Sequence, residues 1–94
     1  MKRVAILGST GSVGATTLKI IQQHKKEFKL EALTVNNNIA GLCQQIVKFR
    51  PQKVAVVDKE SVEKFASKKK ISCDIYSGIH GLNKIASDKD VDIV

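Results

Sequence analysis

The fold is decided by residues 4–14, which read Val-Ala-Ile-Leu-Gly-Ser-Thr-Gly-Ser-Val-Gly. The four apolar residues are typical of a short buried strand, and a helical pattern begins after the glycines. A phosphate-binding turn needs this order: Gly8 lets the strand turn sharply, Gly11 has no Cβ to block a pyrophosphate, and Gly14 lets the helix pack against the strand. Amides at the helix start lack partners within the helix, and the helix dipole attracts an anion there.

The charge around this turn also favours an anion. The spacing Gly-x-x-Gly-x-x-Gly differs from the usual Gly-x-Gly-x-x-Gly, so the surrounding sequence matters more than the glycines themselves. No Asp or Glu occurs from Met1 to Lys26, and helices usually have acidic residues in the first turn. The same range contains five basic residues, Lys2, Arg3, Lys19, Lys25 and Lys26. The alternative is a glycine turn that connects a strand to a helix and binds nothing.

The composition limits the classes of protein to consider. The 94 residues are enough for one small domain, and 43% hydrophobic with 27% charged residues is typical of a soluble globular protein. No apolar run approaches the roughly 20 residues that a membrane-spanning helix needs, and the apolar start is too short for a signal peptide. We therefore expect a cytoplasmic protein with no membrane partner.

The formal net charge of +7 raises the question of a nucleic-acid partner. The lysines are dispersed, and the aromatic residues are one Tyr and three Phe, of which Phe49 and Phe65 fall on apolar helix faces. No stacking platform for bases is visible, so we favour a solvated basic surface and expect no nucleic-acid partner. Cys43 and Cys73 do not form a metal-ligand spacing, and we predict no metal ligands in this sequence.

Apolar segments predict strands and helices in alternation. Strands are expected at about 2–7, 28–35, 54–57 and 71–76, and another begins at 91–94. Helices are expected at 12–23, from 39 to just before Pro51, from Asp58 or Ser61 to the lysines at 68–70, and after Ser77. Their predicted buried sides are Val13, Thr17, Ile20, Ile21 and His24; Ile39, Leu42, Cys43, Ile46 and Val47; Val62, Phe65 and Ala66; and Ile79, Leu82, Ile85 and Ala86.

This alternation predicts an α/β fold, a Rossmann-type parallel sheet with helices on both faces. The expected strand order is third, second, first, with the last strand beside the first. Because only four residues of the last strand are present, we expect the sheet to be incomplete at the C-terminus, as in the opening part of a larger protein.

The end of the second strand bears on which dinucleotide would bind. NAD sites usually have an Asp or Glu there, which accepts from the ribose 2′-hydroxyl and would repel a 2′-phosphate. This sequence has Asn36, Asn37 and Asn38 instead, and the nearby Glu31 lies in the middle of the strand. NADP therefore fits better than NAD, although the three Asn are also typical loop and cap residues, with Asn38 as the N-cap of the second helix.

The stretch from Ile6 to Gly14, followed by Thr16-Thr17-Leu18, resembles the N-terminus of the 1-deoxy-D-xylulose 5-phosphate reductoisomerase family. The resemblance continues through Ala32-Leu33 to Asn38, through Arg50-Pro51 into Val54–Asp58, and to Ser77-Gly78. It covers essentially the whole chain but only the opening part of the family's length.

The resemblance implies an activity and a cofactor. The family rearranges 1-deoxy-D-xylulose 5-phosphate and reduces it with NADPH to 2-C-methyl-D-erythritol 4-phosphate, in the non-mevalonate isoprenoid pathway. It uses a divalent metal, Mg²⁺ or Mn²⁺, and is usually a homodimer. Residues 1–94 would be its N-terminal NADP-binding Rossmann domain. The metal ligands, catalytic residues and sugar-phosphate contacts would lie beyond Val94, so this segment alone is expected to be inactive.

The resemblance also assigns residues to the cofactor. Thr10, Gly11, Ser12 and Val13 would contact its phosphates, and Asn36, Asn37 and Asn38 would contact the adenosine ribose and 2′-phosphate. The family commonly has Gly, a variable and often basic residue, and then Asn at the latter positions. Asn38 matches this pattern, whereas Asn36 and Asn37 depart from it.

Three other functions remain open from the sequence. One is the cofactor domain of another NADP-dependent reductase, such as a semialdehyde dehydrogenase. Another is a nucleotide-binding or regulatory module without catalysis. The third is a basic nucleic-acid module, for which binding would depend on salt concentration.

Overall fold

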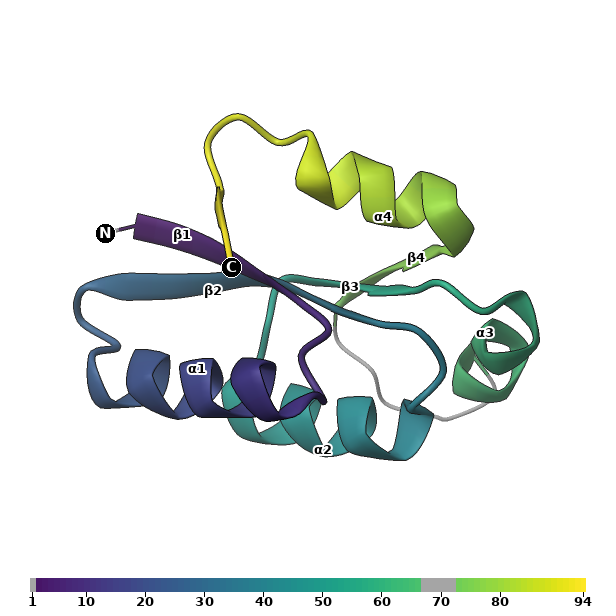
Figure 1. Ribbon diagram of the computed structural model, residues 1–94, viewed down its shortest axis with the longest axis horizontal. Coiled ribbons are helices and arrows are strands. Elements are labelled where there is room, and N and C mark those ends of the chain that lie inside the picture. Colours follow the sequence, from purple (N-terminus) through teal and green to yellow (C-terminus); the bar gives the residue numbers. More distant parts are fainter. Residues whose placement is uncertain (1, 67–72) are drawn as a thin grey trace.

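The computed structural model describes residues 2–66 and 73–94, and within these ranges the chain forms a five-stranded parallel sheet with helices on both faces (Figure 1). The strands are β1 (Lys2–Leu7), β2 (Phe28–Val35), β3 (Lys53–Val56), β4 (Asp74–Ser77) and β5 (Asp92–Ile93). The helices are α1 (Ser12–Gln23), α2 (Ile39–Phe49), α3 (Lys59–Ala66) and α4 (Gly78–Ala86).

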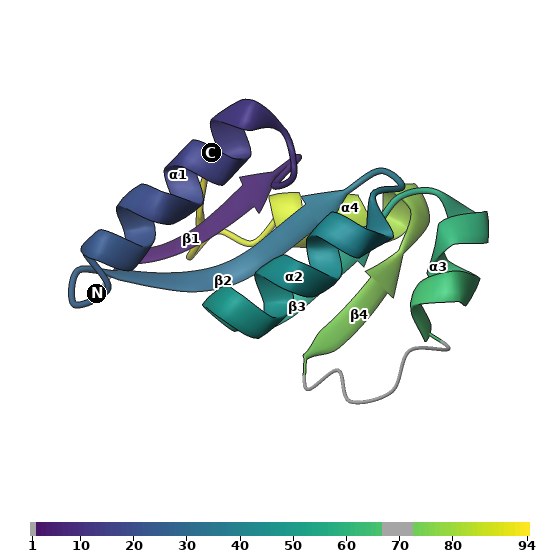
Figure 2. The ribbon, with the colours of Figure 1, turned by 90° about the horizontal axis from the view of Figure 1, so that it is seen from below.

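The strand order is β4-β3-β2-β1-β5, which confirms the predicted arrangement of third, second and first strand with the last strand beside the first. β4 extends the sheet beyond β3, and the predicted positions 71 and 72 of this strand, like the lysines at 68–70, lie outside the described residues. α1 and α2 cover one face of the sheet and α4 covers the other, as both ribbon views show (Figures 1 and 2).

The two faces of the sheet have cores of different size. Successive strand residues point to opposite faces, so the large and small side chains separate. The face under α1 and α2 has the larger core, built from Val4, Ile6, Leu18, Ile21, Leu30, Leu33, Val35, Ile39, Leu42, Ile46, Val54 and Val56. The other face presents Ala5, Ala32 and Ala55 to Ile85 and Val91.

The predicted buried side of α1 is partly wrong. Ile21 is buried as expected, but Val13 is 75% exposed and Ile20 is 51% exposed, and His24 is also exposed. The buried stripe is Gly14, Leu18 and Ile21. Gly14 must lie against the preceding turn, because a Cβ there would be 2.6 Å from the Gly8 carbonyl oxygen. This contact sets the rotation of α1 about its axis and turns Val13 and Ile20 outward.

Two other helices show similar differences. In α2, Ile39, Leu42 and Ile46 are buried as predicted, whereas Val47 is 77% exposed. In α4, Ile85 is buried, but Ile79 and Ala86 are exposed. The remaining buried positions of α4 are Gly78 and Gly81, and a Cβ at Gly81 would lie 2.8 Å from the Tyr76 Cβ. Close approach at a glycine again decides which side of the helix faces the sheet.

Among the described residues, no helix combines the length and apolar character that crossing a membrane requires.

Candidate functional site

The glycine turn follows β1 at the carboxyl end of the sheet. Gly8 adopts a φ of +67°, a left-handed conformation that confirms the predicted sharp turn and favours glycine. The Gly11 amide donates to the Gly8 carbonyl at 3.1 Å and closes the turn. Thr34 of β2 supports it, because its hydroxyl accepts from the Gly8 amide at 3.2 Å and its carbonyl accepts from the Ser9 amide at 2.9 Å.

The start of α1 presents backbone amides without a side-chain cap. Gly11 is the N-cap residue, and the Ala15 amide makes the first intrahelical bond, to the Gly11 carbonyl at 2.9 Å. The amides of Ser12 and Val13 precede that bond, and both residues are exposed. The first turn of α1, all of it within the described residues, has no acidic side chain. This helix end can therefore receive an anion.

The glycines of the turn have different surroundings. A Cβ at Gly14 would lie 2.6 Å from the Gly8 carbonyl oxygen and 2.8 Å from the Ser9 Cα, which confirms the predicted close packing of helix on strand. Gly11 is exposed, and a Cβ there would meet the Gly8 carbonyl oxygen at 3.3 Å. Gly11 thus leaves the outer side of the turn open, as a pyrophosphate would require.

Asn36, Asn37 and Asn38 follow β2 and are all exposed. The Asn38 side chain accepts from the Gly41 amide at 3.0 Å and caps α2, as predicted. The Asn36 carbonyl accepts from the Asp58 amide at 2.9 Å, so the end of β3 lies beside this segment. The Asp58 carboxylate accepts from the Ser61 hydroxyl at 2.7 Å.

The structure brings the glycine turn and the Asn segment together at the start of α2. A Cβ at Gly41 would lie 2.8 Å from the Asn38 Nδ2 and 2.9 Å from the Thr10 Cγ2. Thr10, from the turn, and Asn38, from the end of β2, therefore both approach one glycine. All nine predicted cofactor-binding residues lie on this turn, on the start of α1 or on the adjacent segment, and their contacts with a cofactor remain predictions.

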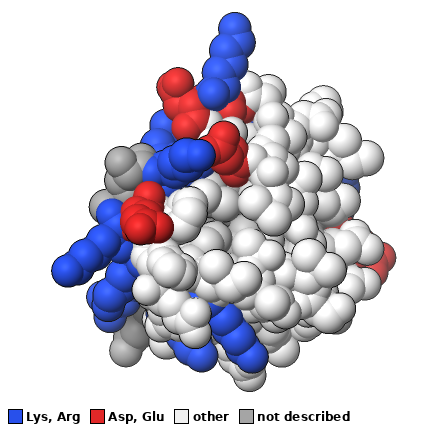
Figure 3. Space-filling model, turned by 60° about the vertical axis from the view of Figure 1, so that its left-hand side comes forward, with Lys and Arg blue, Asp and Glu red and all other residues white. Residues whose placement is uncertain are grey.

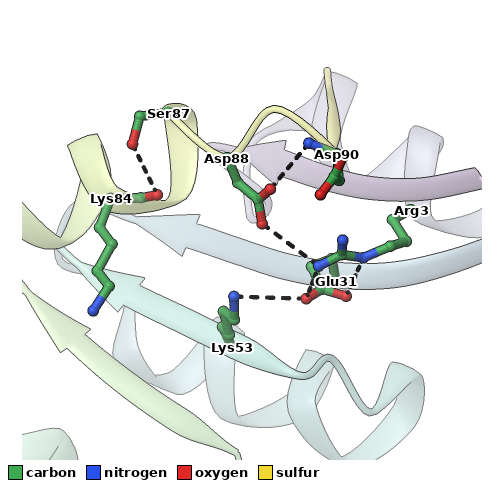
Figure 4. A network of polar contacts seen from close by, with 7 residues as sticks. All are labelled: Arg3, Glu31, Lys53, Lys84, Ser87, Asp88 and Asp90. Atoms are coloured by element: carbon green, nitrogen blue, oxygen red, sulfur yellow. Dashed lines mark hydrogen bonds and ion pairs between the residues drawn. The ribbon is translucent and has the colours of Figure 1, made fainter.

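Glu31, the acidic residue of β2, belongs to a separate cluster (Figure 4). Val4 pairs with Leu30 and Ala5 pairs with Ala32, so Glu31 is an extra residue that forms a β-bulge. Its carboxylate accepts from the Arg3 guanidinium at 2.7 and 3.2 Å and lies 3.6 Å from the Lys53 ammonium. The hydrogen bonds from Arg3 hold the pKa of this buried carboxyl below its usual value.

This cluster also includes the connection between α4 and β5, because Asp88 lies 3.5 Å from Arg3. Glu31 is therefore occupied by basic neighbours, as Figure 4 shows, and it does not stand at the end of β2 where a ribose would lie. This confirms the placement of Glu31 in the middle of the strand.

Sequence reasoning missed three residues that shape the site. Thr34 and Gln45 hold the glycine turn, with the Gln45 Nε2 donating to the Ser9 carbonyl at 2.8 Å, and Asp58 lies beside Asn36. Thr34 and Ser9 are buried. The polar residue Thr34 inside an apolar strand was the one signal that the sequence offered.

In the parts of the chain that the structure describes, no three His, Cys, Asp or Glu side chains come together to hold a metal ion. On the face shown in Figure 3, acidic side chains lie between the basic ones along one side, and much of the remaining surface is uncharged. The basic charge on this face does not form an uninterrupted stripe.

The fold and the turn define a class of protein, the Rossmann-like α/β domains with a glycine-rich turn after the first strand. Within this class the family is specific. Residues 4–94 match the family model for 1-deoxy-D-xylulose 5-phosphate reductoisomerase, and the chain belongs to this family.

Individual relatives agree with this assignment. The chain is 39% identical over 97 residues to the 1-deoxy-D-xylulose 5-phosphate reductoisomerase of Clostridium perfringens (strain SM101), with 100% of this chain and 25% of the relative covered. It is 41% identical over 98 residues to that of Pelodictyon phaeoclathratiforme, with the same coverage of 100% and 25%. The chain thus spans about a quarter of the length of these curated relatives.

Solved structures show the same fold. A crystal structure of DOX-P reductoisomerase in complex with NADPH, fosmidomycin and magnesium superposes with a TM-score of 0.83 at 34% identity, covering 99% of this chain and 24% of that one. The Zymomonas mobilis enzyme in complex with NADPH gives a TM-score of 0.83 at 24% identity, covering 90% and 23%, and supports the fold alone.

Proposed function

We propose that residues 1–94 form the N-terminal NADPH-binding domain of a 1-deoxy-D-xylulose 5-phosphate reductoisomerase. The observation that supports this most directly is the open glycine turn at the start of α1, which meets the Asn36–Asn38 segment at Gly41. A structure of a relative 34% identical to this chain contains NADPH, fosmidomycin and magnesium.

The residues fit the cofactor in three respects. The uncapped amides at the start of α1 suit the diphosphate, and the exposed Gly11 leaves room for it. The exposed Asn side chains can donate amide hydrogen bonds to a 2′-phosphate. The nearby carboxylates are engaged elsewhere, Glu31 with Arg3 and Asp58 with Ser61.

NADPH, when bound, would supply the hydride that reduces the rearranged sugar phosphate. This domain's share of the reaction is to bind and orient the cofactor. We propose that the metal ligands, the sugar-phosphate contacts and the catalytic groups belong to other parts of a full-length, cytoplasmic homodimer that uses Mg²⁺ or Mn²⁺.

The experiment compares NADPH with NADH by calorimetry at one fixed salt concentration. Hydrogen bonds to a charged group contribute roughly 1.5–3 kcal/mol each, and ordering a side chain costs on the order of 0.5–1.5 kcal/mol. We expect NADPH to bind more tightly by about 1–3 kcal/mol, which corresponds to roughly five- to 150-fold.

Two variants and a control locate this preference. Asn37→Arg should increase it, because a guanidinium suits a phosphate, and Asn36→Asp should weaken or reverse it. Asn83→Arg adds the same charge to an exposed position of α4, on the other face of the sheet, and should leave the ratio unchanged. Equal affinity of the wild type for NADH and NADPH would contradict the proposed cofactor preference. An unchanged ratio in Asn36→Asp would show that this segment does not face the ribose.

A further inference from the structure

A side chain of α2 holds the glycine turn from behind. The Gln45 Nε2 donates to the Ser9 carbonyl at 2.8 Å, and Ser9 is fully buried at 0% exposure. We propose that Gln45 is a positioning residue, which fixes the glycine turn so that its outer side is ready for the cofactor diphosphate. This inference rests on the proposed function.

The Ser9 residue is held on both sides. Its amide donates to the Thr34 carbonyl at 2.9 Å, and its carbonyl accepts from Gln45. The amide belongs to the Gly8–Ser9 peptide and the carbonyl belongs to the Ser9–Thr10 peptide. One hydrogen bond therefore restrains each of these two planes, and the bond from Gln45 restrains the Ser9–Thr10 plane. The next residues, Thr10 and Gly11, begin from this fixed plane, so the bond to Gln45 sets the direction in which the turn leaves the sheet.

One side of α2 faces the turn at Ser9 and Thr10. Asn38, Gly41 and Gln45 are spaced by three and four residues, which places them on the same side of a helix. Gly41 approaches Thr10, and Gln45 bonds to Ser9. α2, which is capped by Asn38, therefore also contributes the side chain that holds the glycine turn.

The contact between Gln45 and Ser9 does not satisfy every buried polar atom of the two side chains. Among the described residues, two buried side-chain atoms have no hydrogen-bond partner, and they are the Ser9 Oγ and the Gln45 Oε1. An apolar side chain at position 45 would remove the unpaired Oε1 but would leave the carbonyl of the buried Ser9 without its donor, so the number of unpaired buried polar atoms would not fall. What the glutamine provides at this position is the donor that holds the Ser9 carbonyl.

The test measures cofactor affinity in the full chain. Gln45→Met removes the donor, and Gln44→Met makes the same change at the exposed neighbour on α2. We expect Gln45→Met to weaken NADPH and NADH binding by the same factor, about three- to tenfold for one hydrogen bond, because both share the diphosphate. The NADPH-to-NADH ratio should stay close to the wild type, and Gln44→Met should bind normally. The melting temperature of cofactor-free Gln45→Met should fall, because the buried Ser9 carbonyl loses its donor.

A second pair of variants separates the hydrogen bond from packing. Gln45→Glu keeps the shape of the side chain but lacks the donor at pH 7.5, and Gln44→Glu adds the same charge on the exposed side of α2. A greater loss of cofactor affinity in Gln45→Glu than in Gln44→Glu supports the role of the bond to Ser9. This comparison remains valid if Gln45→Met does not fold. In the full-length enzyme, Gln45→Glu should raise the KM for NADPH and leave kcat at saturating cofactor unchanged.

Several results would overturn the proposal. Wild-type affinity in Gln45→Met and in Gln45→Glu would show that the bond does not position the turn. A changed NADPH-to-NADH ratio would show that Gln45 acts through the Asn segment instead. If the wild type binds neither dinucleotide, the proposed function fails and this proposal with it. A failure confined to the Gln45 variants leaves the proposed function intact.

Discussion

Replacing Gly14 by Ala tests whether close packing of α1 on the turn holds this part of the fold together. The new Cβ would lie 2.6 Å from the Gly8 carbonyl oxygen, 2.8 Å from the Ser9 Cα and 3.0 Å from the Ser9 carbonyl carbon. All three neighbours are backbone atoms of the turn. No flexible side chain can move aside, so either α1 or the turn must shift.

The expected loss of stability follows from two opposing effects. Overpacking typically costs about 1–3 kcal/mol, and rigid backbone neighbours place this site at the upper end, about 3 kcal/mol. Ala is better than Gly within a helix by about 1 kcal/mol. The net loss is about 2 kcal/mol, which corresponds to a decrease in melting temperature of about 8–16 °C for a domain of this size.

Gly11→Ala is the matched control, because it adds the same methyl group three residues earlier. Gly11 has a φ of −71°, and the new Cβ would meet the Gly8 carbonyl oxygen at 3.3 Å, so a small movement relieves the contact. Its expected cost is about 1 kcal/mol or less. Thermal unfolding followed by circular dichroism compares the two. A melting temperature of Gly14→Ala within about 3 °C of the wild type would refute the proposed role of close packing. A melting temperature no lower than that of Gly11→Ala would refute it as well.

Three further changes have definite expected outcomes. Gly11→Val should abolish dinucleotide binding in calorimetry while circular dichroism stays native, because a branched side chain would fill the open side of the turn; unchanged affinity would show that the turn is not the site. Glu31→Gln should lower the melting temperature at pH 7, and by progressively less as the pH falls below the ordinary carboxyl pKa of 4.5, because the stability contributed by the depressed pKa is lost between that value and the pKa of folded Glu31; an effect that does not shrink as the pH is lowered would contradict this. Arg50→Gly should stabilise the protein by about 0.5–1 kcal/mol in urea unfolding, since Arg50 has a φ of +51° at the end of α2, and a destabilised variant would disprove it.

The order of the elements could be predicted from the sequence because each strand and helix has a strong local signal. The expected ranges 2–7, 12–23 and 28–35 match β1, α1 and β2 as the structure has them. β5, at 92–93, lies within the predicted range 91–94 and pairs with β1, as the order of a Rossmann sheet requires.

The rotation of the helices could not be predicted in the same way. A hydrophobic pattern treats Val13 and Ile20 as buried because they are apolar, yet both are exposed. The rotation of α1 depends on Gly14, which has no hydrophobic side chain and so contributes nothing to the pattern. The sequence predicts that Gly14 packs against the strand, but it does not show which side of α1 this contact turns toward the sheet.

The site shows the same division between local and distant information. The glycine turn and the cap at Asn38 involve neighbouring residues, and the sequence was sufficient to predict both. The supports of the turn come from far along the chain, since Thr34 lies 26 residues from Gly8 and Gln45 lies 36 residues from Ser9. Nothing in the local pattern of α2 distinguishes Gln45, which bonds to the turn, from Gln44, which is exposed.

Choice between NADPH and NADH must be made away from the glycine turn, because the turn would contact only the diphosphate that both cofactors share. That leaves the segment 36–38 and its neighbour Asp58, whose amide is bonded to the Asn36 carbonyl. A carboxylate so near would repel a 2′-phosphate if it were turned toward the Asn side chains. Because the Asp58 carboxylate instead accepts from Ser61, at the start of α3, we propose that the neutral Asn segment faces the 2′-phosphate.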